Sequence, residues 1–230
     1  MAFSRITSAM AGNNTSQTSW ALAAQNVTTG NLICGAIMHE GAVQTLTSAN
    51  VTDTAGNTYV MGPTRSSAAG TQHVYSFYCL SATGNASNVI TVTLPAARTY
   101  FFVTAAQYSS GGAVSLADSR TATSAAVTTV SSPSLTTSST NGLIYAASKQ
   151  FDSGTVSAGT STTAIATNTG FSIHGERLLS SAGSNTVAFN HSASTTMTMV
   201  ALAFNEGGGD TTAPTLTSAT GVVTVCLVPA

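Results

Sequence analysis

The stretch Phe101-Phe102-Val103-Thr104-Ala105-Ala106-Gln107-Tyr108 carries apolar or small residues on both sides of a period-two pattern. In a strand, Phe101, Val103 and Ala105 share one face, and the residues between them share the other. Such a run, rich in aromatic and β-branched residues, indicates a strand that is buried on both faces. The run Met197–Phe204, near the other end of the chain, has the same character. We therefore expect two central strands, one in each half of the sequence.

Further runs of alternating or apolar residues predict more strands, and turn clusters such as Thr28-Thr29-Gly30-Asn31 separate them. The expected strands are Ser19–Gln25, Leu32–His39, Val74–Cys79, Val89–Leu94, Tyr100–Tyr108, Leu143–Lys149, Phe171–Leu179, Thr186–Asn190 and Thr195–Phe204. Pro95 lacks a backbone donor and is expected to end the strand before it. No helical stripe with capping signals is found. This pattern predicts an all-β protein, an antiparallel and jelly-roll-like β-sandwich.

The same order of signals occurs in both halves. Gly30-Asn31-Leu32-Ile33 opens one apolar strand and Asn141-Gly142-Leu143-Ile144 opens another, and each half ends in one of the two long apolar runs. We interpret this as a degenerate internal duplication, with pseudo-repeats at about 18–110 and 130–206 inside a sandwich that spans residues 1–206. Because about five strands are too few to bury both faces of a sheet, we expect the halves to intercalate into one sandwich. Two stacked small sandwiches are the alternative.

The end of the chain has a different composition. Residues 207–214 form a Gly-rich linker with three consecutive glycines and a proline at its end. Residues 215–230 are apolar and β-branched but too short to bury themselves. We expect them to form an arm that adds a strand to a sheet of the same chain or of an adjacent subunit.

Charge excludes several classes of protein. Charged residues make up 6% of the 230 residues, and the formal net charge is −1. Six scattered Lys and Arg residues cannot form a phosphate-neutralising patch or a polybasic membrane anchor, so neither nucleic acid nor a membrane is an expected partner. A hydrophobic content of 43% excludes a disordered chain.

Targeting signals and cysteines point to synthesis in a reducing cytosol. The N-terminus lacks the basic start and apolar core of a secretory signal, and the longest apolar runs fall short of the ~18–20 residues that span a bilayer. Cys34, Cys79 and Cys226 are odd in number, which favours buried free thiols over a disulfide framework.

Motifs of catalysis are absent from the sequence, and the only dense polar groupings are His39-Glu40 and His174-Gly175-Glu176-Arg177. The second could be an acid–base pair or half of a metal site, but we interpret it as a strand end with a cross-strand ion pair. Asp53, Asp118, Asp152 and Asp210 could meet around Ca²⁺, although an aspartate in a loop usually caps its own turn. We therefore assign no catalytic, cofactor-binding or metal-binding residue.

Aromatic residues offer a further candidate site, a platform on which sugars stack. Most of them lie in phase with the expected strands and are interpreted as core residues or cross-strand pairs. The residues in question are Trp20, Tyr59, Tyr75, Tyr78, Tyr100, Tyr108 and Tyr145.

The element Val51-Thr52-Asp53-Thr54-Ala55-Gly56-Asn57-Thr58-Tyr59 resembles part of a β-sandwich module that occurs in virion surface proteins of tailed bacteriophages and in some bacterial surface proteins. Gly30–Ile33 and Val103–Tyr108 extend the resemblance, and Asn141–Ile144 and Val200–Phe204 fit the same module, so that it covers roughly residues 18–206. Asp210–Thr217 resembles the junction that leads, in similar phage proteins, into an immunoglobulin-like domain, expected here to be missing or reduced to a tail. An immunoglobulin domain proper is disfavoured, because Trp20 precedes both Cys34 and Cys79.

The resemblance implies a structural virion protein without catalytic residues. We expect a capsid decoration (cement) protein or a head- or tail-fibre component, made in the bacterial host cytoplasm and located in the virion. Its expected partners are the major capsid protein or other virion proteins and further copies of itself in a multi-copy shell. The alternative is a carbohydrate-binding module or host-surface adhesin that binds glycans. An enzyme such as a polysaccharide lyase is a third hypothesis, but it needs paired carboxylates that the sequence does not place.

Overall fold

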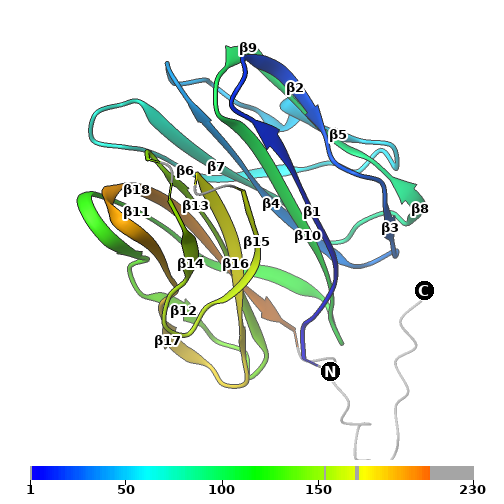
Figure 1. Cartoon of the computed structure of the whole chain (residues 1–230). Coiled ribbons are helices and arrows are strands. Elements are labelled where there is room, and N and C mark those ends of the chain that lie inside the picture. The colour runs from blue at the N-terminus through cyan, green and yellow to red at the C-terminus, as the bar shows by residue number, and fades with distance from the viewer. Residues whose placement is uncertain (1, 153, 169–170, 208–230) are drawn as a thin grey trace, which may run out of the picture.

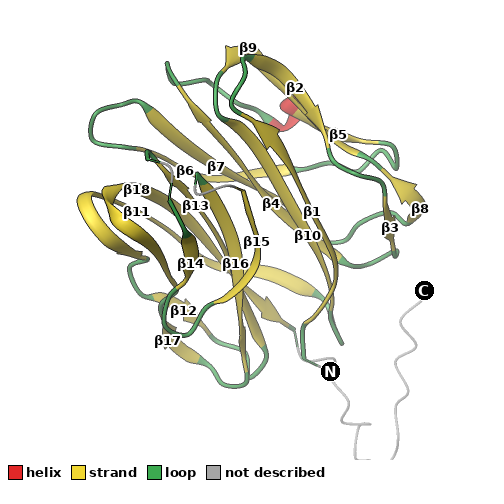
Figure 2. Cartoon of the chain, viewed as in Figure 1, coloured by secondary structure: helices red, strands yellow, loops and turns green. Residues whose placement is uncertain are grey.

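The computed structural model describes residues 2–152, 154–168 and 171–207, and this part of the chain is built from antiparallel strands (Figures 1 and 2). Its one helical element is a single 3₁₀ turn at Ser48–Asn50. No described helix has the length and apolar character needed to cross a membrane. The expected all-β, antiparallel class is therefore confirmed for these residues.

The first half of the chain forms one large sheet and two small ones. The large sheet has five strands in the order β1 (Ser4–Asn13), β10 (Phe101–Ser109), β4 (Leu32–Glu40), β7 (Gln72–Cys79) and β6 (Val60–Ser66). The small sheets are β2 (Gln17–Ala21), β9 (Ile90–Arg98) and β5 (Val51–Asp53), and β3 (Gln25–Val27) with β8 (Asn85–Asn88).

The second half forms another large sheet and one two-stranded sheet. The large sheet runs in the order β11 (Val114–Ser131), β18 (Ala188–Glu206), β13 (Gly142–Gln150), β16 (Ser172–Leu179) and β15 (Thr163–Asn168), and β14 (Val156–Ala158) pairs with the start of β18. The pair β12 (Leu135–Thr137) and β17 (Gly183–Asn185) completes this half.

The two large sheets pack face to face in the middle of the molecule (Figure 1). One apolar cluster lies between them, a second lies between the first large sheet and β2, β9 and β5, and a third lies on the outer face of the second large sheet. The middle cluster contains the buried residues Phe3, Leu32, Cys34, Ala36, Met38, Val74, Phe102, Ala106, Tyr108, Leu143, Tyr145, Ala147, Val200, Leu202 and Phe204. Both faces of each large sheet are thus covered.

The expected intercalation of the two halves is wrong for the described residues. Every strand pairs only with strands of its own half, so the arrangement is the stacked alternative. The expectation failed because the ends of β11 and β18 fold over their own sheet: Val130 and Phe189 pair with each other and belong to the outer cluster. Each half therefore covers one face of its large sheet by itself, and the two halves cover each other's remaining face.

The central strands are confirmed, and the edge strands were missed. Phe101–Tyr108 in β10 and Met197–Phe204 in β18 are buried on both faces. The expected strand end at Pro95 is wrong, because β9 continues to Arg98. Pro95 lies at a break in the register with β2, where its missing donor interrupts no regular ladder.

The sequence did not predict β1, β6, β11 or β15, which are the half-exposed outermost strands of the large sheets. The two runs expected at Thr186–Asn190 and Thr195–Phe204 form one strand, β18.

Candidate functional site

The contact layer between the two large sheets contains polar as well as apolar side chains. Thr104 on β10 and Tyr145 on β13 share a hydrogen bond of 2.7 Å between their hydroxyls, and the Tyr145 hydroxyl lies 3.3 Å from Nδ1 of His174 on β16. Thr198 on β18 donates to the side-chain carbonyl of Gln72 on β7 at 3.4 Å. These contacts join one half of the chain to the other. We call this contact layer, including the ion pairs Lys149–Glu40 and Arg5–Glu176 that also join the two sheets, the intersheet seam.

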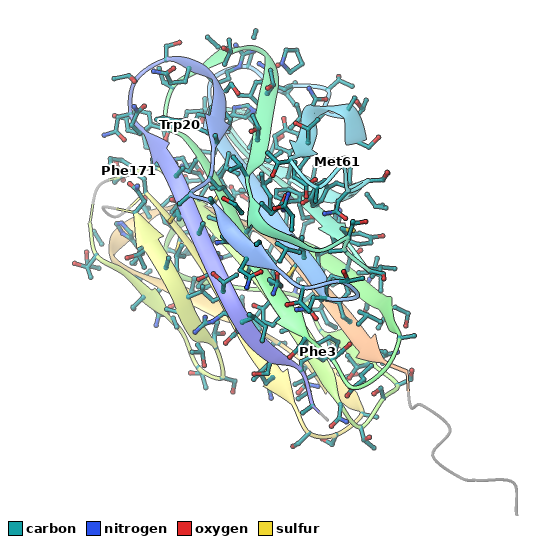
Figure 3. The ribbon with its side chains drawn as sticks, turned by 90° about the vertical axis from the view of Figure 1, so that its right-hand side faces the viewer. Phe3, Trp20, Met61 and Phe171 are labelled. Atoms are coloured by element: carbon teal, nitrogen blue, oxygen red, sulfur yellow. The ribbon has the colours of Figure 1, made fainter. Side chains whose placement is uncertain are left out.

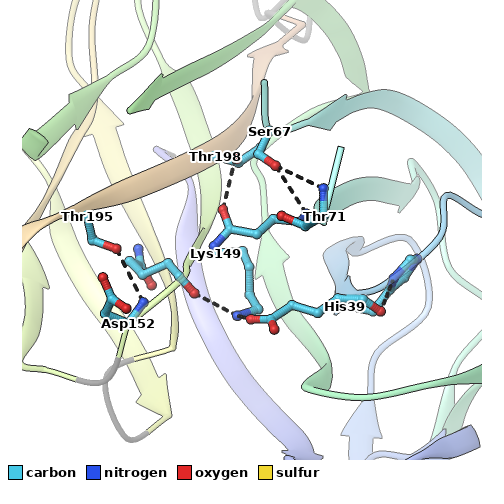
Figure 4. Close-up of polar contacts among 10 residues, drawn as sticks. His39, Ser67, Thr71, Lys149, Asp152, Thr195 and Thr198 are labelled. Atoms are coloured by element: carbon cyan, nitrogen blue, oxygen red, sulfur yellow. Dashed lines mark hydrogen bonds and ion pairs between the residues drawn. The ribbon is translucent and has the colours of Figure 1, made fainter. Parts of the chain in front are cut away.

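The first ion pair of the intersheet seam joins Lys149 on β13 to Glu40 at the end of β4, with 2.6 Å between Nζ and Oε1 (Figure 4). The Lys149 side chain is 0% exposed and that of Glu40 is 15% exposed. Nζ also donates to the Gln150 carbonyl at 2.6 Å and lies 5.3 Å and 5.2 Å from the ring centres of Tyr100 and Phe171. Burial lowers the pKa of Lys149, and the neighbouring Glu40 carboxylate opposes this shift.

The second ion pair joins Arg5 on β1 to Glu176 on β16, with 3.5 Å between Nη1 and Oε1. His174 is buried in the same region, and its pKa is lowered to about 3 by burial and by the charge of Arg5. The interpretation of His174–Arg177 as a strand end is therefore wrong; the expected ion pair is present, but its partner Arg5 lies in the other large sheet. His174 and Glu176 lie inside β16, Glu176 pairs with the other half of the chain, and Arg177 donates to the Thr186 carbonyl at 2.8 Å.

His39 lies on the opposite face of β4 from Glu40, although the two are neighbours in sequence. Its ring stacks on Tyr75 at 5.5 Å between ring centres and lies 5.0 Å from that of His73. Its pKa is lowered to about 3, mainly by burial and then by the nearby His73. His39-Glu40 is therefore not one polar group in space, because β4 sends the two side chains in opposite directions.

The aspartates considered as Ca²⁺ ligands do not come together among the described residues. Asp53 accepts hydrogen bonds from the amide and side chain of Asn57, from the Tyr59 hydroxyl at 2.7 Å and from Asn88. Asp118 accepts from the backbone of Ser119 and Thr136 and pairs with Arg120. No group of three or more metal-ligating side chains occurs in the described ranges, and Asp210 lies outside them.

The candidate aromatic platform is mostly core. Tyr59, Tyr75, Tyr108 and Tyr145 are buried, as interpreted from strand phase. Trp20, Tyr78 and Tyr100 are partly buried and pack against the clusters. Phe3 belongs to the middle cluster and Phe171 packs against it, and Figure 3 shows the two well apart along the molecule.

Cys34 and Cys79 are buried free thiols, as expected. Burial raises the pKa of both thiols, which keeps them protonated and unreactive at neutral pH. Cys226 lies outside the described residues, and so do the arm at 215–230 and all of the linker except Gly207, whose amide donates to the Ala113 carbonyl at 2.7 Å.

Lys149 is a residue of the intersheet seam that the sequence analysis does not single out. It ends the expected strand Leu143–Lys149, is the only lysine in the sequence, and stands in a run of apolar and small residues. A single charge in such a run indicates a buried ion pair, although it does not identify the partner.

Comparison with protein-family models, with curated proteins and with solved structures finds no match for this chain.

Proposed function

We propose that this chain is a structural protein of a tailed-bacteriophage particle, of the capsid decoration (cement) or fibre type. The observation that carries the proposal is the state of the sheet edges. In the described part of the chain, the edge strands of the large sheets are β1, β6, β11 and β15; the first three carry charged residues, whereas β15 carries none. Monomeric proteins protect such edges with charge, particularly lysine, and this chain has no lysine to use there. An open, uncharged edge such as that of β15 suits a protein that packs beside many copies or against a shell.

The ionisable groups of the intersheet seam also fit this role. Lys149, Glu40, Arg5 and Glu176 are engaged with one another and join the two halves of the chain. The remaining surface is poor in charge, so contacts between crowded neighbours would be weakened little by salt. Many weak contacts repeated over a shell add up to firm attachment.

We further propose that the two halves descend from one duplicated, jelly-roll-like unit. The sheet orders β1-β10-β4-β7-β6 and β11-β18-β13-β16-β15 have the same form. In each half, the first strand along the chain pairs with the last one. The pair β3 and β8 corresponds to β12 and β17, and β5 on β9 corresponds to β14 on the start of β18. In each half a large sheet faces smaller strands that connect to it in alternation, as in double Greek-key sandwiches.

Purified phage particles provide the test. Peptide mass spectrometry should find this protein at a fixed copy number relative to the coat protein, and the number should survive a high-salt wash. Ala164→Lys, on the exposed face of the edge strand β15, should reduce the copy number of the protein on particles. Ala96→Lys, on the inner strand β9 of a small sheet, is the matched control and should leave it unchanged. Absence of the protein from particles would overturn the proposal.

An adhesin or carbohydrate-binding module is the second candidate, because the surface carries a polar hollow. This open hollow, of about 420 Å³, is lined by Ser161, Thr162, Thr163, Glu176, Arg177 and Leu178. Hydroxyl, carboxylate and guanidinium groups of this kind can hydrogen-bond to sugars, although no aromatic ring lines the hollow. Binding of the isolated protein to a glycan array, lost in Arg177→Ala, would favour this candidate.

A further inference from the structure

Lys149 and Glu40 lie at the end of the molecule opposite to the chain connection between the two halves. β10 ends at Ser109 and β11 begins at Val114, so the short connection 110–113 joins the halves at one end of the large sheets. Ser109 pairs with Ser4 at that end, whereas Glu40 donates its amide to the Thr99 carbonyl beside the start of β10, at the other end. The halves are thus joined by backbone at one end and by the Lys149–Glu40 pair at the other.

The surroundings of the pair exclude water from the amine. Lys149 is 0% exposed, and three aromatic rings, those of Tyr100, Phe102 and Phe171, lie 5.2 to 6.0 Å from Nζ. A buried ion pair loses much of its Coulomb attraction to the desolvation of its charges. In such a site, transfer of one proton along the hydrogen bond between Nζ and Oε1 gives a neutral amine beside a neutral carboxylic acid. Burial of Lys149, which lowers its pKa, acts in the same direction.

We propose that Lys149 and Glu40 condense to an amide bond that links the two halves of the chain covalently. The reaction converts one ammonium and one carboxylate to one amide and one water. After the proton transfer, the lone pair of Nζ attacks the carboxyl carbon of Glu40, and the new N–C bond forms. The second proton moves from nitrogen to the departing hydroxyl, the C–O bond breaks, and water leaves. No oxidation, reduction or further reactant is involved.

The geometry favours this step. Nζ lies 2.6 Å from Oε1, so the carboxyl carbon one bond further away is at most about 3.9 Å from Nζ, close to the separation of a near-attack arrangement. Groups held in this way react as if their concentration were about 10⁵–10⁸ M. The Glu40 side chain is 15% exposed, which provides an exit for the water molecule from an otherwise closed site. The product is uncharged, so the reaction removes two charges from a buried site.

The test begins with the mass of the intact, folded protein. The proposal predicts a mass lower by one water than the mass of the sequence. The Lys149→Met and Glu40→Leu variants should each have the full mass of their own sequences. Glu176→Gln, which removes the other ion pair between the large sheets, is the matched control and should still lose one water.

Trypsin locates the bond. The cleavage sites of the chain are Arg5, Arg65, Arg98, Arg120, Lys149 and Arg177. An amidated lysine is not cleaved, so digestion of the denatured protein should give one branched product in which peptide 6–65 is joined to peptide 121–177. An ion pair without the amide gives separate peptides 121–149 and 150–177 and the full intact mass, and this result would overturn the proposal. The digest and the mass of the unaltered protein decide the matter even where a variant fails to fold.

Discussion

Two buried histidines should make this fold sensitive to mild acid. The pKa of His39 is lowered to about 3, first by burial and then by His73, and that of His174 is lowered to about 3, first by burial and then by Arg5. In the unfolded chain both titrate near the ordinary value of about 6.5. The unfolded state therefore binds protons before the folded state does. Stability is complete above about pH 6.5 and is lost as the pH falls from there toward 3.

The magnitude follows from the distance to the unfolded pKa. At pH 5 each histidine is about 1.5 pH units below 6.5, and at about 1.4 kcal/mol per unit it removes about 2 kcal/mol from the free energy of unfolding. The two together remove about 4 kcal/mol, a large share of the total of about 5–15 kcal/mol that is usual for a domain.

Urea unfolding at pH 7.5 and pH 5.0, followed by circular dichroism, measures this loss. His174→Gln should reduce the difference between the two pH values by about half, because it leaves only His39 to titrate. His39→Gln should do the same independently, since the two side chains lie in different apolar layers. An equal free energy of unfolding at both pH values, or a pH dependence that survives both substitutions, would refute the reasoning.

Four other changes test the remaining parts of the structure. Val103→Asp places a charge without a partner at a position 0% exposed in β10, and should abolish soluble expression; a soluble variant that melts cooperatively would contradict a central strand here. Gly35→Ala puts a methyl group against the Thr104 carbonyl and the Phe77 ring, and should lower the free energy of unfolding by about 1–3 kcal/mol in urea titrations. Asp53→Asn turns an acceptor of four hydrogen bonds into a partial donor, and should lower the melting temperature through a loss of about 1–3 kcal/mol. Truncation after Glu206 should leave cooperative melting intact but weaken attachment to particles; normal attachment would end the hypothesis of a C-terminal arm.

The parts of the fold that the sequence predicted are those in which burial dictates the residue type. β4, β10, β13 and β18 have neighbours on both faces, so nearly every position is apolar or small and the pattern identifies a strand. Edge strands such as β11 are half-exposed and rich in Ser, Thr and Ala, a composition equally typical of loops. Only the pairing with β18 fixes β11 as a strand, and pairing over such a separation is not visible in one sequence.

The intersheet seam could be predicted only in part. The sequence marks Lys149 as a lone charge in an apolar run, but its partner Glu40 is 109 residues away. Nothing in the local pattern of either strand indicates that the two meet. The two residues meet because the halves are stacked and not intercalated. That arrangement depends in turn on the end of β11 and the start of β18, which fold over their own sheet. The hydrogen bonds of Asp53 are easier to predict from the sequence, because two of the donors, Asn57 and Tyr59, lie only four and six residues further along the chain.

The burial of Lys149 also determines which reagents can attack the outer surface. No other lysine occurs in the sequence, so the folded protein presents no lysine amine to solvent. Aldehyde fixatives and amine-directed labels would therefore not react with its side-chain amine, but with the exposed lysines of other proteins. A cross-link to a side chain of this protein would therefore have to be made through another group, such as a carboxyl or a hydroxyl.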